Sequence, residues 1–203
     1  MIDNILRSNI ERSVEVHGRL MDACLPAMIT AADALIGAYR KGYKALFFGN
    51  GGSSTDAEHL AGEFVGRFLR DRGPMPAVAL SENMAAVTAI ANDYGYEHVF
   101  SRQLQAFAVP GDVAVAISTS GKSQNVIQGV RKARELGLFT IGLTGGSGGQ
   151  MRELVDALIA VPSNDTPRIQ ECHILIGHAL CDAVEQAIVN SQPLGGVSSR
   201  AKS

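Results

Sequence analysis

Apolar residues recur along this chain in short, nearly continuous runs that alternate with longer stretches of helical spacing. The runs cover residues 44–49, 75–80, 112–118, 138–144 and 156–162. Because their apolar residues are continuous rather than alternating, we expect strands that are covered on both faces, as in a parallel sheet. Helical segments are expected between and beside them, at residues 53–69, 83–93, 123–137 and 148–155. This alternation predicts an α/β fold with a doubly wound parallel sheet of about five strands flanked by helices.

The start of the chain adds a helical extension to this core. Residues 1–42 read as two helices, with Pro26 separating the first from the second. We expect residues 1–190 to form a single domain that includes these helices. Residues 191–203 hold few apolar anchors, so they are predicted to be a flexible tail.

Helix boundaries can be predicted at several polar, glycine and proline positions. Ser123 is placed to cap the helix that follows it, and Gly137 is placed to end that helix. A long closing helix is expected from about Thr166 to Asn190, with Pro167 suited to its first turn.

Composition narrows the class of protein. Hydrophobic residues make up 46% and charged residues 19% of the chain, which favours a large buried core over disorder. Eighteen Lys and Arg against twenty Asp and Glu give a net charge of -2, which argues against a nucleic-acid partner. No apolar run approaches the roughly 20 residues that span a bilayer, and the N-terminal residues lack the apolar region of a signal peptide. We therefore expect a cytoplasmic protein with no membrane partner.

The three cysteines are an odd number, which is a poor basis for a disulfide framework. Cys24, Cys172 and Cys181 lie in apolar helical surroundings, and none belongs to a CxxC pair. We expect all three to be reduced and buried.

The segment STSGKS, from Ser118 to Ser123, follows one predicted strand and opens a helix. The free N–H groups and positive end of a helix favour an anion, and the hydroxyl groups of this segment suit a phosphate monoester. The alternative is the P-loop of an NTPase, since AISTSGKS departs from GxxxxGK[ST] only at Ala116 and offers Lys122 to the terminal phosphates. The segment has one glycine and no later strand ends in an aspartate suited to magnesium, so the phosphate anchor is favoured.

A second glycine-rich loop, GNGGSS at residues 49–54, also joins a strand to a helix. It matches a dinucleotide fingerprint only in part, because Ser54 stands where the third glycine belongs and no acidic residue closes a strand about 20 residues on. A glycine-lined wall that lets backbone approach a sugar or phosphate is the more economical interpretation.

Four polar residues on two predicted helices could bind a metal or transfer a proton. His59 and Glu63 are four residues apart and share one helix face, which suits a metal site, a base with its partner, or a plain surface pair. Gln170 and His178 lie about 12 Å apart along the closing helix, so both reach one ion only from opposite sides or with help from a second subunit. His173 is rotated away from His178, which favours a packing or capping role. The residues alone leave these alternatives open.

Five motifs in order make the chain resemble the sugar isomerase (SIS) family and, within it, the phosphoheptose isomerases. They are GNGGSS-DAEHLAGEF, AIANDYGYEHVFSRQL, ISTSGKS-NV, LTGGSGG-M and RIQECHILIGH. The match covers nearly the whole chain, up to about residue 188. The resemblance implies the SIS fold, a tetramer with sites between subunits, and a zinc ion.

The same resemblance implies roles for individual residues. The family's phosphate-holding positions match Ser118, Thr119, Ser120 and Ser123. The sugar-lining positions match Asn50, Gly51, Gly52 and Ser53, with Asn92 and Asp93 on another wall and Arg67 reaching a neighbouring site. The family's zinc ligands match His59, Glu63, Gln170 and His178. Gln170 is also matched to substrate binding. Glu63 and His178 match the acid–base pair.

The implied reaction converts sedoheptulose 7-phosphate to D-glycero-D-manno-heptose 7-phosphate, the entry to bacterial heptose synthesis. The alternative is a non-catalytic SIS protein that binds a sugar phosphate or the replication initiator. That branch lacks the equivalents of Glu63 and His178, and this chain has both. The chain departs from some members at Pro167, where they carry an aspartate; the nearest acid here is Asp165.

Overall fold

The computed structural model describes residues 1–190, and the predicted tail at residues 191–203 lies outside the described residues. The elements follow the chain in the order α1 (Ile2–Gly18), α2 (Leu20–Arg40), β1 (Ala45–Gly49), α3 (Gly52–Val65), β2 (Ala77–Ala79), α4 (Met84–Tyr94), η1 (Tyr96–His98), α5 (Val99–Phe107), β3 (Val113–Ile117), α6 (Gln124–Glu135), β4 (Phe139–Gly145), η2 (Gly149–Glu153), β5 (Ala157–Val161) and α7 (Thr166–Asn190).

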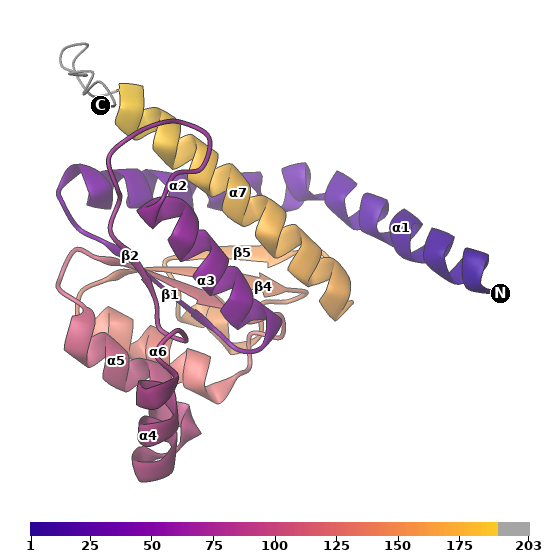
Figure 1. The fold of residues 1–203 in the computed structure, drawn as a ribbon. Helices are drawn as coiled ribbons and strands as arrows, with labels where there is room; N and C mark the ends of the chain where they lie inside the picture. The colour runs from indigo at the N-terminus through magenta and orange to yellow at the C-terminus, as the bar shows by residue number, and fades with distance from the viewer. Residues whose placement is uncertain (191–203) are drawn as a thin grey trace, which may run out of the picture.

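The five strands form one parallel sheet in the order β2-β1-β3-β4-β5. Helices α2, α3 and α7 cover one face, and α5 and α6 cover the other (Figure 1). The predicted fold class is therefore confirmed. The strand order reverses between β1 and β3, and ligands of open α/β sheets bind beyond the strand ends at such a point. The two glycine- and serine-rich loops follow these two strands.

The hydrophobic core is split by the sheet into two clusters. Phe47 and Phe48 are neighbours on β1 and point to opposite faces, as successive strand residues must. Phe47 stacks on Phe64 of α3 at 5.9 Å between ring centroids, and Phe48 meets Phe100 of α5 at 5.2 Å. Burial on both faces explains why the strand sequences are continuously apolar.

The predicted break at Pro26 is wrong. The first helix ends at Gly18, the second begins at Leu20, and Pro26 lies inside α2. Proline removes one backbone hydrogen bond from a helix, but buried Cys24 and Ala31 on either side of it pack into the core. Tertiary packing on both sides holds the helix through the proline.

Two further segments differ from the helices predicted from the sequence. Within residues 148–155, where an α-helix was expected, only Gly149–Glu153 are helical and form the short 3-10 helix η2, because Gly148 and Gly149 have positive φ. Helix α5 was not among the expected helices, although Phe100 and Leu104, four residues apart, are both buried.

The predicted ends of α6 can be compared with the structure, as can the predicted state of the three cysteines. Gly137, at φ 78°, donates its N–H to the carbonyl of Arg134 and ends α6 as expected. Ser123 occupies the N-cap position, but its side chain makes no capping bond. The three cysteines are free and buried, as predicted.

Two helices, α2 and α7, have the length and the apolar composition of a membrane-spanning helix. This corrects the expectation that no segment of the chain is long and apolar enough to span a bilayer. Helices in the cores of globular proteins can have the same length and apolar composition. Residues of both helices pack into the core cluster on one face of the sheet.

The buried His173 predicts a pH-dependent stability. Its Nε2–H donates to the Thr144 carbonyl at 3.1 Å, and burial lowers the pKa of His173 to about 4. In the unfolded chain the pKa of His173 is about 6.5, so as the pH falls the unfolded state binds a proton before the folded state does. The free energy of unfolding is therefore highest above pH 6.5 and falls as the pH drops towards 4. The expected loss is about 3 kcal/mol, measured by urea unfolding. His173→Gln keeps a donor for Thr144 and should flatten this part of the pH profile; an unchanged slope would contradict the assignment.

Candidate active site

The site is built where α3 and α7 lie side by side (Figure 1). Helix α3 begins directly after the short loop that follows β1, so its N-terminus lies at the carboxyl end of a central strand. On α7, a Cβ added to Gly177 would lie 2.5 Å from the side chain of buried Leu60 on α3. The absence of a side chain at Gly177 therefore lets the two helices approach closely beside His178.

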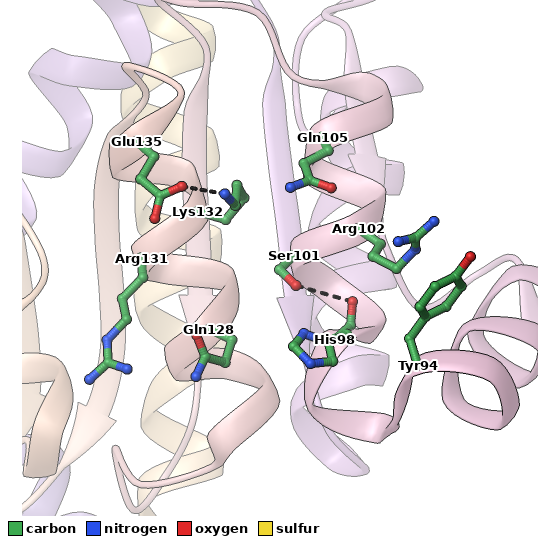
Figure 2. A pocket seen from close by; sticks show the side chains of 9 residues that line it. All are labelled: Tyr94, His98, Ser101, Arg102, Gln105, Gln128, Arg131, Lys132 and Glu135. Carbon is green, nitrogen blue, oxygen red and sulfur yellow. Dashed lines mark hydrogen bonds and ion pairs between the residues drawn. The ribbon is translucent and has the colours of Figure 1, made fainter.

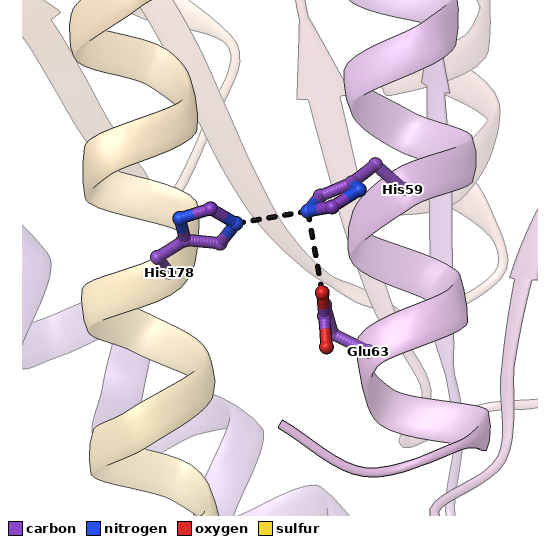
Figure 3. Close-up of side chains that lie close together, drawn as sticks. All are labelled: His59, Glu63 and His178. Carbon is purple, nitrogen blue, oxygen red and sulfur yellow. Dashed lines mark hydrogen bonds and ion pairs between the residues drawn. The ribbon is translucent and has the colours of Figure 1, made fainter. Parts of the chain in front are cut away.

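His59, Glu63 and His178 converge across this helix pair, as Figure 3 shows. His59 Nε2 lies 2.8 Å from His178 Nε2 and 3.3 Å from Glu63 Oε1. The ring of Phe68 lies 5.3 Å from the His178 ring and walls one side. The His59 and Glu63 side chains are 48% and 22% exposed, so the cluster is open to a ligand from solvent.

The donor atoms of this cluster suit a metal ion. One ring nitrogen from each histidine and one carboxylate oxygen of Glu63 all lie within 4.8 Å of one another. Imidazole nitrogen with carboxylate oxygen is a donor set that zinc prefers, and three such protein ligands leave room for a further ligand. The His59–Glu63 spacing, which sequence left open, thus belongs to a three-residue cluster.

Gln170 lies at another point of the helix pair. Its side-chain amide packs against the start of α3, where a Cβ on Gly52 would lie 2.4 Å from Gln170 Nε2. It lies eight residues, or about 12 Å, before His178 on the same helix. Its predicted role as a fourth metal ligand stays a prediction.

The STSGKS loop lies at the end of β3 and forms one wall of a cavity of about 230 Å³. Thr119, Ser120 and Lys122 line this cavity, whereas Ser118 is buried and its Oγ lies 3.2 Å from Ser123 Oγ. The loop is held in a left-handed turn at Gly121 (φ 61°), where a Cβ would lie 2.1 Å from the carbonyl oxygen of Gly148. Thr119 and Ser120 therefore offer hydroxyl groups, and Lys122 a positive charge, to one cavity just before the N-terminus of α6, which favours a phosphate.

The GNGGSS loop forms a second wall, at the end of β1. Asn50 and Gly51 line a cavity of about 340 Å³ together with side chains of α4 and α5. Gly51 has φ 56°, a conformation that favours glycine, and Ser53 is buried under the loop. Asn50 exchanges hydrogen bonds with Asn125 of α6, so the GNGGSS loop is tied to the helix that follows the STSGKS loop.

Three of the predicted site residues lie on the surface, apart from this cluster. Asn92 and Asp93 are exposed at the end of α4, and Asn92 Nδ2 donates to Asp93 Oδ1 at 2.8 Å. Helix α4 points away from the α3–α7 pair (Figure 1). Arg67 is also exposed, two residues beyond α3. Within residues 1–190, none of these three side chains forms a hydrogen bond or ion pair with His59, Glu63 or His178.

The acid nearest to Pro167 is engaged elsewhere. Asp165 Oδ2 accepts from Arg12 of α1 at 3.1 Å. Asp165 therefore ties the start of α7 to the N-terminal helix.

Sequence reasoning did not single out Asp56, three residues before His59 on α3. One of its carboxylate oxygens is buried without a hydrogen-bond partner in the described part of the chain. Burial raises the pKa of Asp56, and the charge of His59 works in the opposite direction. The signal was present in the quoted motif DAEH, but an unpaired buried oxygen becomes visible only in three dimensions.

A further cavity, of about 410 Å³, lies between α5 and α6 and contains none of the predicted site residues (Figure 2). Its guanidinium groups do not converge: Arg102 stacks on the Tyr94 ring at 3.6 Å, while Arg131 points away from α5. The candidate chemistry is therefore concentrated at the α3–α7 pair and the two loops.

Comparison with known proteins gives consistent relatives. Residues 10–145 match the SIS domain family. A phosphoheptose isomerase of Rhodospirillum rubrum is 48% identical over 92% of this chain and 99% of its own length. One from Aneurinibacillus thermoaerophilus is 46% identical over 94% of this chain and 98% of its own length.

Solved structures agree in fold. A phosphoheptose isomerase from Neisseria gonorrhoeae has a TM-score of 0.87 at 38% identity, over 92% of this chain and 100% of that one. One from Francisella tularensis has a TM-score of 0.89 at 35% identity, over 92% of this chain and 99% of that one.

Proposed function

This chain belongs to the SIS domain family and is an isomerase, and from that premise we propose that it converts sedoheptulose 7-phosphate to D-glycero-D-manno-heptose 7-phosphate. The observation that carries the proposal is the convergence of Glu63 with His59 and His178. A carboxylate and imidazoles at one open point are the groups that aldose–ketose isomerisation needs.

Binding of the substrate is assigned to the two loops. The hydroxyl groups of the STSGKS loop (Ser118, Thr119, Ser120, Ser123) would hold the phosphate at the N-terminus of α6. Residues 50–53 would line the sugar, with Gln170 between the two regions. A phosphate anchored far from the reacting carbons supplies binding energy that holds those carbons in place.

The chemical step is a proton transfer between neighbouring carbons through an enediol. The Glu63 carboxylate removes the proton from C1 of the ketose and returns it to C2. His178 gives a proton to the C2 oxygen as the enediol forms and takes the proton of the C1 hydroxyl as the aldehyde forms. Glu63 Oε1 lies 3.3 Å from His59 Nε2, and Oε2 has no partner within residues 1–190. One oxygen can therefore serve a metal while the other takes the proton.

A zinc ion fits the donor set. It would be held by His59, Glu63 and His178, with Gln170 as a fourth donor. When bound, zinc polarises the substrate carbonyl as a Lewis acid.

The exposed apolar face of α1 supports assembly as a homotetramer with sites between subunits. Helix α1 projects from the body of the molecule (Figure 1), and its large apolar side chains are 56–74% exposed at Ile2, Ile5, Leu6, Ile10 and Val14. An isolated helix of this kind is marginal in water, so a second copy of the chain is the proposed cover. Neighbouring subunits would then bring Arg67, Asn92 and Asp93 to the site.

We place this reaction in the cytoplasm, because the proposed substrate is a phosphorylated intermediate. The reaction would be the first step of bacterial heptose biosynthesis, which feeds glycans such as lipopolysaccharide.

Turnover with and without metal tests the proposal. Purified protein is incubated with sedoheptulose 7-phosphate as isolated, after chelation, and after zinc is restored, and the aldose is followed by NMR. Chelation should reduce turnover by at least about 10²-fold, and zinc should restore it, because the metal stabilises developing charge.

Two results would contradict the proposal. Absence of turnover with zinc present would overturn the isomerase assignment to this substrate. Light scattering of the same sample checks the assembly, and a monomer at micromolar concentration would exclude the tetramer.

A further inference from the structure

A pair of side-chain amides joins the two loops of the site. Asn50 follows β1, and Asn125 lies in the first turn of α6, 75 residues later. Asn50 Nδ2 donates to Asn125 Oδ1 at 2.8 Å, and Asn125 Nδ2 donates to Asn50 Oδ1 at 2.8 Å. The hydroxyl of Tyr96 donates to the same Asn50 Oδ1 at 2.9 Å. Asn125 is only 3% exposed, so the two bonds between the amides are shielded from competing water.

One backbone group determines which way every amide in this network points. The backbone N–H of Val126 donates to Asn125 Oδ1 at 2.9 Å, and a backbone N–H has no acceptor function. The oxygen of Asn125 must therefore lie on that side, which requires Asn50 to donate its Nδ2 to it. Asn50 Oδ1 then faces the Asn125 amide and the Tyr96 hydroxyl, and both donate to it.

The network leaves Asn50 with one unused function, and that function is a donor. Its oxygen accepts two hydrogen bonds, and one of its two amide hydrogens is taken by Asn125. The other hydrogen has no partner in the part of the chain that the structure describes. Asn50 lines the cavity of about 340 Å³ at the end of β1.

We propose that Asn125 and Tyr96 are positioning residues that hold Asn50 as a hydrogen-bond donor to an oxygen of the sugar. This inference rests on the proposed function, since it takes the sugar to bind beside Asn50. A donor fixed in this orientation selects an acceptor and stabilises negative charge on an enediolate oxygen. An amide free to rotate would offer its oxygen equally well and would repel that charge.

The test is a double-mutant cycle between Asn125 and Asn50. Asn125→Asp retains the acceptor for Val126 and the start of α6 but removes the donor to Asn50. We expect it to lower kcat/KM and the affinity for sedoheptulose 7-phosphate by about 10- to 100-fold, because a charge-assisted hydrogen bond is no longer aligned. In an Asn50→Ala background the same change should cost less than about 3-fold, since residues that act through one another are not additive.

Two further variants separate positioning from folding. Tyr96→Phe removes one hydroxyl from a half-exposed side chain and should cause a smaller loss that also disappears in the Asn50→Ala background. Asn83→Asp makes the same chemical change at the N-cap of α4, where only the oxygen is used, accepting from Ala86 N–H at 3.1 Å. It should leave kcat/KM within about 2-fold of the unchanged protein.

The outcomes distinguish this inference from the proposed function. Calorimetric binding of sedoheptulose 7-phosphate and turnover are both measured on every variant. Binding without turnover in the unchanged protein would reject the isomerase proposal, and the cycle would still be judged on affinity. Equal losses from Asn125→Asp in both backgrounds, or no loss at all, would overturn the positioning role. Absence of both binding and turnover would overturn both.

Discussion

Replacing Glu63 with glutamine is expected to lower kcat for isomerisation by about 10³-fold or more while sugar-phosphate affinity stays within a few-fold. Glutamine retains the size of the side chain and an oxygen near His59, but it cannot accept the substrate proton. The phosphate anchor lies on a different loop and is untouched. Single-turnover kinetics and calorimetric binding on the zinc-loaded variant separate the two effects.

Glu135→Gln is the matched control for this change. Glu135 pairs with Lys132 on the exposed side of α6, in the cavity remote from the cluster, so its loss should leave kcat unchanged. Bound zinc must be measured in parallel. If Glu63→Gln lost its metal together with its activity, Glu63 would be assigned to metal binding alone. If the unchanged protein showed no turnover and Glu63→Gln left its sugar-phosphate affinity unaltered, a non-catalytic SIS protein that binds sugar phosphate would be favoured.

Glu185→Gln is expected to lower the free energy of unfolding by about 3–5 kcal/mol, because it breaks a buried ion pair on one side. The Glu185 side chain is fully buried and accepts from the backbone N–H groups of Phe68, Leu69 and Arg70 at 2.8–3.0 Å. Its ion-pair partners are Arg72, whose side chain is 2% exposed and donates at 3.1 Å, and the Arg70 guanidinium at 3.8 Å. The amide would leave the Arg72 charge buried without a counter-charge.

Urea unfolding at neutral pH measures this loss, and the exposed Glu153→Gln provides a control that should stay within about 0.5 kcal/mol. Burial tends to raise the pKa of Glu185, but the three backbone N–H groups and Arg72 outweigh it, and the pKa ends below its usual value. The stabilisation is therefore present above the ordinary carboxyl pKa and is lost as pH falls through the folded value. The variant and the unchanged protein should converge in acid; a constant difference at all pH values would contradict the ion-pair explanation.

The consequence of Glu185 for the site is geometric. Its bonds hold the segment after α3, and Phe68 in that segment packs against His178 at 5.3 Å between ring centroids. A carboxylate near the end of the last helix thus stabilises the wall beside the cluster of His59, Glu63 and His178. The burial of Glu185 was not predicted from the sequence. The residues that bond it, at positions 68–72, lie more than 110 residues earlier in the chain.

Local pattern determined the fold class of this protein. Five apolar runs separated by helical spacing have few solutions other than a covered parallel sheet, because each strand must bury both faces. Helix α7 was bounded from Thr166 to Asn190 by its first-turn proline and its apolar period. Local pattern failed where packing outweighed it, as in α2, which continues through Pro26 because both of its halves pack into one core.

The candidate site divides in the same way. The sequence by itself determined that His59 and Glu63 share a helix face and that STSGKS opens a helix, because both statements depend only on spacing of a few residues. Only the tertiary structure decided that His178 meets His59 at 2.8 Å and that Asn125 exchanges hydrogen bonds with Asn50. Those contacts join positions 119 and 75 residues apart, and they depend on how closely helices and loops pack, which spacing along one helix does not encode.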